Sequence, residues 1–253
     1  MSIYPDPQTP AERIRALVRD RVWQNSSRVH LDAFAREAGE SVPAGALVLD
    51  AGAGVAPYRK HFAHTQYETA DFLQVDKAYE PMDYVCSLDD IPVADDRFDL
   101  VLLTQVLEHV PEPQSVLREL QRVLKPGGTI WLSAPLFYAE HEQPYDFYRY
   151  TQFGFRHQLE SAAFEVVDIA WLEGYGGTVS YQLKEAVMKL PLRPADYGGG
   201  LLGATCSALV GLLKPVLFAA SALLARADLR HKYTQSGQCK NYRVIARKAD
   251  APT

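Results

Sequence analysis

The sequence predicts an α/β protein in which a parallel β-sheet is covered by helices on both faces. Short apolar runs typical of buried strands alternate with segments whose apolar residues recur at helical spacing. A glycine-rich turn follows the first apolar run, as expected after a buried parallel strand. Apolar side chains make up 47% of the 253 residues, which is enough for a substantial core.

The N-terminal part predicts helices before the first strand. Between residues 9 and 38, apolar side chains recur at helical spacing among Arg and Glu, so we expect an N-terminal helical cap over residues 1–40. The main domain is then expected over residues 41–253. Its first strand is the apolar run 46–49, which ends in Asp50 and the turn-forming residues AGAG.

The remaining elements continue this alternation. The clearest helix is expected over residues 113–124, where Val116, Leu117 and Leu120 share one face, and residues 125–128 (KPGG) supply a helix stop and a tight turn. Further strands are expected at residues 67–72, 84–86, 100–103, 129–133, 166–170 and 241–246.

Charge and cysteine usage exclude several classes of protein. There are 26 basic and 31 acidic residues, a net charge of −5, so we expect no nucleic-acid partner. Cys86, Cys206 and Cys239 are odd in number and form no CxxC pair, which argues against a disulfide framework or a zinc knuckle. This cysteine usage predicts a cytoplasmic protein. Because the N-terminus lacks the apolar core of a secretion signal, we expect the working protein to begin at Met1.

The most informative segment is LVLDAGAGVAPY, residues 47–58. A glycine turn at the end of such a strand brings backbone N–H groups to the crevice where α/β sheets bind ligands, and Gly52 and Gly54 allow close approach. Asp50 is poorly placed for a diphosphate but suits a cationic ligand such as S-adenosylmethionine. Asp71, 21 residues later, lies where a carboxylate can accept both ribose hydroxyls.

Several motifs occur together in this order. They are DAGAGVA from Asp50, Asp71, CSLDDIPVADDRFDLVLLTQVLEHV from Cys86 and VLKPGGTIWLSAP from Val123. Over residues 47–169 the chain thereby resembles the class I S-adenosylmethionine-dependent methyltransferases. The resemblance implies a three-layer Rossmann-like fold with a mostly parallel, seven-stranded sheet whose last strand is antiparallel. It also implies S-adenosylmethionine as cofactor and S-adenosylhomocysteine as product.

The resemblance assigns cofactor-binding residues, with two departures from the family pattern. Ala56 stands where many members have a third glycine, and Ser87 stands where many have the Asp that holds the adenine amino group. Adenine recognition is thus left to the Ser87 hydroxyl, a backbone N–H near Leu88, or Asp89. The residues implied in cofactor binding are Asp50, Gly52, Gly54, Asp71, Phe72, Ser87, Leu88, Thr104 and Gln105.

Residues 137–155 are expected to form the substrate pocket, because they hold eight aromatic residues after the fifth strand. The segment resembles a subgroup of the family with a loop similar to E-H-E-x-P-Y-D-F-x-R-Y-T. Tyr145 and Tyr148 are expected to bind substrate through their rings, and Arg149 to bind an anionic portion. An aromatic-rich interface between subdomains is the alternative.

His141 is the expected catalytic residue. A sulfonium methyl group is already activated, so the main task is to align the acceptor, and a hydroxyl acceptor also needs a base. Glu140, Glu142 and Tyr145 are rivals for this role, and His141 could instead cap a turn or bond Asp146. His109 is expected to be structural.

No metal is expected. Gln105, Glu108 and His109 resemble the E-x-x-E-H pattern of metal-assisted 2′-O-methyltransferases, with His141 as a conceivable further ligand. Gln105 replaces a carboxylate, however, and this weakens a site for a hard cation.

A late apolar segment breaks the alternation. Residues 197–213 carry no charge but are slightly short for a membrane span, so we expect a helical insertion at about 176–235. Residues 214–253 have eight basic and two acidic side chains. A homodimer through residues 197–225 and a peripheral membrane contact both stay open as partners.

The expected function is transfer of a methyl group from S-adenosylmethionine to a hydroxyl of a small molecule or saccharide. One alternative is a non-catalytic partner or sensor protein that binds S-adenosylmethionine or S-adenosylhomocysteine. Another is a lipid-like acceptor at a membrane surface.

Overall fold

The computed structural model describes residues 25–74 and 79–250. Within them, seven strands form one sheet in the order β3-β2-β1-β4-β5-β7-β6. Strands β1 to β5 pair in parallel, and β7 is antiparallel to both β5 and β6. The predicted α/β fold with an antiparallel last strand is confirmed.

The centre of the sheet consists of β1 (Leu47–Ala51), β2 (Gln66–Asp71) and β4 (Phe98–Thr104). β1 lies between the other two and pairs with both in parallel. Its residues are almost all buried because both faces of the sheet are covered. β3 (Tyr84–Val85) is a short edge strand beside β2. The carboxyl ends of these strands therefore lie at one edge of the sheet.

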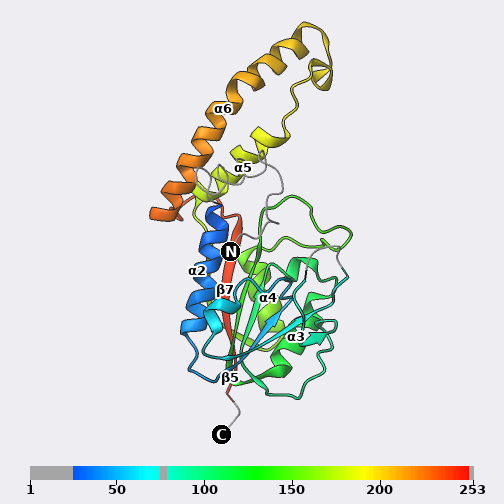
Figure 1. Cartoon of the computed structure of the whole chain (residues 1–253), viewed down its shortest axis with the longest axis vertical. Coiled ribbons are helices and arrows are strands. Elements are labelled where there is room, and N and C mark those ends of the chain that lie inside the picture. Colours follow the sequence, from blue (N-terminus) through cyan, green and yellow to red (C-terminus); the bar gives the residue numbers. More distant parts are fainter. Residues whose placement is uncertain (1–24, 75–78, 251–253) are drawn as a thin grey trace. The chain divides into compact units, whose positions relative to one another are not determined.

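Helices cover the sheet on both sides (Figure 1). On one face, Phe34 of α2 (Ser26–Glu40) lies against Trp131, with ring centroids 5.1 Å apart. On the other face lie α3 (Pro113–Val123) and α4 (Gln152–Ser161), which bury Leu117 and Phe155 completely. Since successive strand side chains alternate between faces, both sides of the sheet contribute to the core.

The KPGG segment lies inside a strand. β5 spans Leu124–Pro135 and begins directly after α3. The helix stop predicted there is present, but pairing with β4 shifts from Phe98↔Leu124 to Leu100↔Thr129, so the intervening residues bulge. Gly127 takes φ +76°, which suits glycine. The predicted turn is thus an irregularity within β5.

The last strands complete the sheet. β6 (Phe164–Trp171) and β7 (Asn241–Lys248) pair antiparallel, and β7 also pairs along β5 from Thr129 to Pro135. Short 3-10 helices follow β1 (η1, Arg59–Phe62) and β4 (η2, Leu107–His109). The second of these contributes to the site described below.

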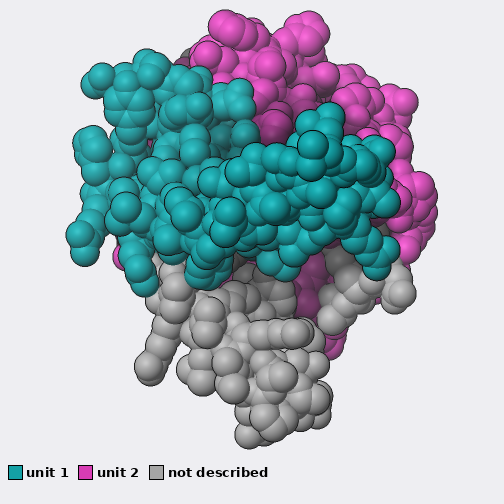
Figure 2. All heavy atoms as spheres, turned by 90° about the horizontal axis from the view of Figure 1, so that it is seen from above, with its two compact units in different colours: residues 1–30, 173–239 teal, residues 31–172, 240–253 magenta. Residues whose placement is uncertain are grey.

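The chain divides into two compact units (Figure 2). One comprises residues 31–172 and 240–253 and holds the sheet; the other comprises residues 1–30 and 173–239. Residues 1–24 of the predicted N-terminal cap lie outside the described residues.

In the second unit, α5 (Tyr175–Lys189) packs along α6 (Gly200–Arg230). The short 3-10 helix η3 (Pro194–Tyr197) lies in the segment that connects them and contacts α6. Ser180 and Ser221 join the two helices, because each hydroxyl donates to the other residue's carbonyl oxygen, at 2.7 and 2.8 Å. Among the described helices, α6 alone is long and apolar enough to cross a membrane, judged by length and composition.

Candidate functional site

A cavity of about 570 Å³ lies where the parallel strands end. Its walls come from the segments after β1, β2, β3 and β4 and from the loop after β5. Open α/β sheets bind their ligands at this edge. The predicted residues that line the cavity are Gly52, Asp71, Phe72, Ser87, Leu88, Gln105 and Tyr145.

The glycine turn after β1 forms one wall. Gly52 takes φ +77°, and a Cβ atom there would lie 2.4 Å from Cγ2 of Val106, so a side chain does not fit. Its N–H donates to the carbonyl of Ala70 at 2.8 Å. Gly54 takes φ +56° and faces open space, since a Cβ there would have no neighbour within 4 Å.

Asp71 ends β2 and is almost completely buried. Its carboxylate accepts hydrogen bonds from the N–H of Gly54 at 3.0 Å and of Leu73 at 3.2 Å. A carboxylate held in this way at a cavity wall can accept further hydrogen bonds from a ligand, such as those of two neighbouring hydroxyl groups.

Asp50 lies behind this wall. It is buried, it is not among the residues that line the cavity, and it accepts a short hydrogen bond from the Tyr67 hydroxyl. Burial raises the pKa of Asp50 to about 7 and also raises the pKa of Tyr67. The predicted contact of Asp50 with a cationic ligand stays a prediction.

Three neighbouring residues offer polar groups at one end of the cavity. Ser87, Leu88 and Asp89 follow β3, and all three line the cavity, so the alternatives for adenine recognition remain together. Directly after β2, the Phe72 ring packs edge-on against Tyr145, with centroids 5.5 Å apart. Aromatic walls of this kind suit a planar ring or the methyl group of a sulfonium cation.

Gln105 lies directly after β4 at the cavity wall. Its backbone takes φ +55°, its N–H donates to the carbonyl of Ser133, and its side-chain amide lies 3.2 Å from the Ser133 hydroxyl. Thr104 pairs with Ser133 in the β-sheet and does not itself line the cavity. The bond to Ser133 therefore fixes Gln105 relative to β5.

The loop after β5, residues 136–151, is held against η2. The N–H groups of Phe147 and Tyr148 donate to the Glu108 carbonyl at 2.8 and 3.2 Å. The Tyr150 hydroxyl donates to the Leu107 carbonyl at 3.1 Å, and the Thr151 hydroxyl caps α4 by accepting from Gly154. These bonds hold the aromatic loop at the cavity.

Within this loop, Arg149 makes internal contacts. Its guanidinium donates to both oxygens of Asp146, at 2.7 and 2.8 Å, and to the carbonyls of Tyr138 and Ala139. The arginine holds the pKa of Asp146 well below its usual range. Arg149 and Tyr148, whose hydroxyl donates to the Pro111 carbonyl, do not line the cavity. Their contacts with substrate stay predictions.

His141 lies at the base of the loop. Its backbone N–H donates to the Asp146 carboxylate at 2.8 Å, and its ring Nδ1 lies 3.2 Å from the Ala139 carbonyl oxygen. Its ring packs edge-on against His109, with centroids 4.6 Å apart. Burial lowers the pKa of His141, so its imidazole is neutral near pH 7 and able to accept a proton.

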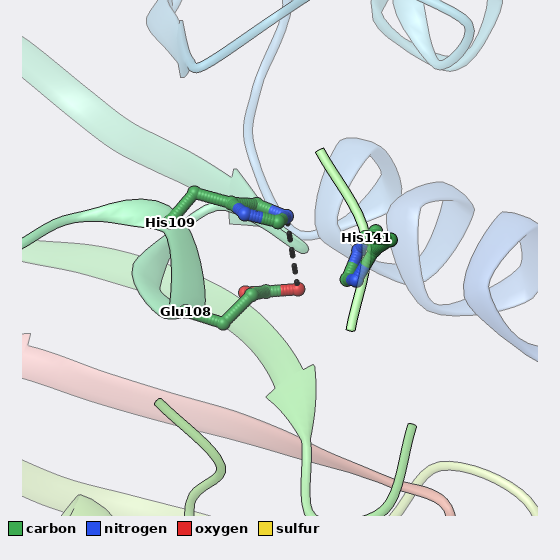
Figure 3. Close-up of side chains that lie close together, drawn as sticks. All are labelled: Glu108, His109 and His141. Carbon is green, nitrogen blue, oxygen red and sulfur yellow. Dashed lines mark ion pairs between the residues drawn. The ribbon is translucent and has the colours of Figure 1, made fainter. Parts of the chain in front are cut away.

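A three-residue cluster unites this loop with η2 (Figure 3). Glu108 is completely buried, and within the described part of the chain neither of its carboxylate oxygens has a hydrogen-bond partner. Its Oε1 lies 3.9 Å from Nε2 of His109, and His141 faces the same point. Burial raises the pKa of Glu108 to about 8.

His109 has two roles in the structure. Its Nδ1 hydrogen-bonds the Tyr145 carbonyl, in line with the predicted structural role, and its ring also lines the cavity. The site prediction omitted this lining role. Other lining residues that it omitted are Gln74, Val85, Cys86, Val106, Val110, Pro111, Glu112, Val116, Glu142 and Phe147. Most of them lie in the loops that follow the strands β2 to β5, and a position in such a loop is the signal that could have identified them.

Comparison with known proteins identifies a related family over part of the chain. Residues 49–132 match the family described as a methyltransferase domain. The ubiquinone biosynthesis O-methyltransferase of Pseudomonas entomophila is 35% identical over 89 residues, which is 35% of each chain. The chain spans only 16% to 35% of the length of such curated relatives.

Solved structures share the fold at low sequence identity. The [4+2]-cyclase SpnF has a TM-score of 0.55 and 20% identity, over 87% of this chain and 82% of its own. The 1,6-didemethyltoxoflavin-N1-methyltransferase of Burkholderia thailandensis, solved with S-adenosylhomocysteine, has a TM-score of 0.51 and 17% identity, over 99% and 93%. The architecture is that of class I methyltransferases, and it also occurs in an enzyme named as a cyclase.

Proposed function

We propose that the protein is an S-adenosylmethionine-dependent methyltransferase, because residues 49–132 match the methyltransferase-domain family and the sheet has the class I methyltransferase topology. The observation that carries this proposal is the position of Asp71. Its buried carboxylate lies beside the glycine turn, at the wall of a cavity large enough for a small-molecule ligand.

The cofactor is proposed to lie along the strand ends. Asp71 would accept hydrogen bonds from the ribose hydroxyls. The segment Ser87, Leu88 and Asp89 would offer polar groups to the edge of the adenine ring. Gly52 and Gly54 would leave room for the methionine part of the cofactor. Phe72 and Gln105 would lie on either side of the cofactor. Asp50 and Thr104 would act from behind the wall, through Tyr67 and Ser133.

Methyl transfer requires alignment above all. A lone pair of the acceptor oxygen forms the new O–CH₃ bond while the S–CH₃ bond breaks, and S-adenosylhomocysteine leaves. The hydroxyl proton must go to a base. His141 is proposed for this role because its imidazole is neutral and packs against His109, which lines the cavity although His141 itself does not. Tyr145 would form part of the acceptor pocket.

The acceptor class is proposed as a hydroxyl of a small molecule. The partial relatives named as O-methyltransferases support oxygen as the acceptor atom, and the aromatic rings of Phe72, Tyr145 and Phe147 suit a ring or sugar face. Tyr148 and Arg149 could contact larger substrates only after the loop rearranges, because their polar groups are engaged.

Labelled S-adenosylmethionine tests this function. The purified protein is incubated with a cell extract and methyl-labelled cofactor, and the labelled product is identified. Transfer to a small hydroxyl compound is expected from the wild type and not from a His141→Ala variant. A protein that binds S-adenosylhomocysteine but labels nothing would instead be a non-catalytic binder or sensor.

The second unit is proposed to meet a lipid surface. At 3.6 residues per turn, seven exposed aliphatic residues of α6 fall within an arc of about 120° and extend over about 33 Å. They are Leu201, Leu202, Leu209, Leu212, Leu213, Val216 and Leu223. Such a face is typical of helices that lie in a membrane interface.

Two further features favour lipid over a second copy of the chain. The hydroxyls along α6 are satisfied within the unit: Thr205 donates to the Leu201 carbonyl at 2.9 Å and Ser207 to the Leu192 carbonyl at 2.6 Å. Arg226 and Arg230 follow the apolar face and complement anionic headgroups. A lipid-like acceptor would be consistent with this contact. Cytoplasmic location and a homodimer through residues 197–225 stay predictions.

A further inference from the structure

The Glu108 side chain has an unusual environment for a carboxylate. It is completely buried, and neither oxygen has a hydrogen-bond partner among the described residues. Buried carboxylates are normally paired, hydrogen-bonded or coordinated to a metal ion. The nearest cationic or ligating group is the imidazole of His109, at 3.9 Å, which is too far for a hydrogen bond.

Both neighbouring histidines are oriented as metal ligands usually are. Nδ1 of His109 hydrogen-bonds the Tyr145 carbonyl, and Nδ1 of His141 lies 3.2 Å from the Ala139 carbonyl and 3.4 Å from Asp146. A ring nitrogen that faces an oxygen acceptor carries the proton, so the Nε2 lone pair of each ring is available. Acceptors in these positions fix the tautomer and the ring orientation.

The three ligating groups converge. One ligand atom from each of Glu108, His109 and His141 lies within 4.8 Å of the others, and the side chains point at a common centre (Figure 3). Two imidazoles and one carboxylate form a donor set that favours a divalent transition-metal ion over Mg²⁺ or Ca²⁺, which prefer oxygen ligands. Three protein ligands leave coordination positions open for a substrate.

We propose that Glu108, His109 and His141 bind a divalent transition-metal ion at the cavity wall, where it holds the acceptor oxygen for methyl transfer. The second half of this proposal rests on the proposed function. Of the three ligands His109 lines the cavity, as does Glu142, the neighbour of His141 in the chain, so an acceptor in the cavity can reach the cluster from the His109 side. The sequence pattern argued against a metal because Gln105 replaces a carboxylate. In the structure Gln105 bonds Ser133 instead, and the cluster is complete without it.

Metal binding would change the role of His141 from proton acceptor to ligand. The acceptor hydroxyl would coordinate the ion, and its proton would pass to solvent water as coordination lowers its pKa. The oxygen then forms the O–CH₃ bond while the S–CH₃ bond breaks. The products are the methyl ether, S-adenosylhomocysteine and one proton, and no electron is gained or lost.

Titration of the full-length protein with metal tests the site without any substrate. Protein freed of metal with a chelator is titrated with Zn²⁺, Mn²⁺ and Co²⁺ by calorimetry, and the visible absorption of bound Co²⁺ reports its coordination. We expect one ion per chain for the wild type. Glu108→Gln and His141→Ala should each weaken binding at least tenfold, while His157→Ala, an exposed histidine on α4, should bind as the wild type does.

Circular dichroism establishes that each variant is folded. No binding of any of the three ions by the folded wild type, or equal binding by His141→Ala, would overturn the proposal. Titration of the same preparations with S-adenosylhomocysteine separates the two claims. Metal binding without S-adenosylhomocysteine binding leaves the site standing and defeats the proposed function; the reverse result defeats only the metal site.

Discussion

The carboxylate of Asp71 accepts a hydrogen bond from the backbone N–H of Gly54, at 3.0 Å. This bond connects the end of β2 to the glycine turn after β1, although the two residues belong to different strand–loop segments. The same carboxylate also accepts from Leu73 and is nearly inaccessible to solvent. The geometry of the proposed cofactor site therefore depends on a side chain and a turn that fix each other.

Gly52→Ala should disrupt the cavity more than Gly54→Ala. A Cβ at position 52 would lie 2.4 Å from the Val106 side chain. The alanine would also have to adopt the backbone φ of +77°, which is unfavourable for any residue with a side chain. At position 54 only the backbone strain applies, at about 1 kcal/mol, because the space is open. Thermal unfolding and S-adenosylhomocysteine titration of both variants measure this difference. Equal losses for the two variants would contradict it.

Asp50→Asn should remove a pH dependence of stability. Burial raises the pKa of folded Asp50 from 3.8 to about 7, so between these values the unfolded chain has released a proton that the folded chain retains. The free energy of unfolding therefore falls as the pH rises through this window, and the contribution is lost above about 7.

Denaturant unfolding at several pH values measures this effect. The stability of Asp50→Asn relative to the wild type should increase from pH 4 to pH 8, since Asn carries no titrating proton and can still accept from Tyr67. Asp95→Asn, a change at an exposed carboxylate, is the control. Parallel curves for Asp50→Asn and the wild type would show that Asp50 is ionised in the folded protein.

Arg149→Met should loosen the aromatic loop. The change removes two charge-assisted bonds to Asp146 and the bonds to the Tyr138 and Ala139 carbonyls, which together should cost about 2 kcal/mol. Chymotrypsin should cleave the loop faster than in the wild type. Arg156→Met, which removes an exposed pair with Glu160, is the matched control. Unchanged cleavage would mean that other contacts hold the loop.

Replacing leucines on α6 should abolish binding to lipid vesicles. The triple variant Leu209→Gln, Leu212→Gln and Leu213→Gln places polar groups at the middle of the exposed face. Co-flotation with vesicles of phosphatidylcholine and phosphatidylglycerol should be lost, while Phe153→Gln, at an exposed position on α4, should float as the wild type does. A wild-type dimer that ignores vesicles and dissociates in the triple variant would favour a second copy instead.

The strands were predictable because parallel strands buried on both faces appear as continuous apolar runs. β4, which pairs in parallel with both neighbours, extends two residues before the predicted run and one residue after it. The KPGG segment was harder, because its proline and glycines signal a turn equally well outside a strand or in a bulge. Proline usually breaks a helix interior, yet α6 continues through Pro215 to Arg230.

Part of the site could not be predicted from local patterns. Asp50 and Asp71 have the same residue type and both follow apolar runs, yet Tyr67 engages only Asp50, because the β1–β2 pairing brings the tyrosine to it. The sequence pattern did name Glu108, His109 and His141 together, but their convergence depends on how the loop after β5 packs on η2. Such contacts arise from tertiary packing, which spacing along the chain does not encode.

Titration of the folded protein with S-adenosylhomocysteine tests the central claim most directly. We expect one binding site per chain for the wild type, binding weakened by about 1–3 kcal/mol in Asp71→Ala, and unchanged binding in Asp95→Ala, whose carboxylate pairs with Arg122 outside the cavity. Absence of binding by the folded wild type, or identical binding by Asp71→Ala, would contradict the assignment of this cavity as the cofactor site.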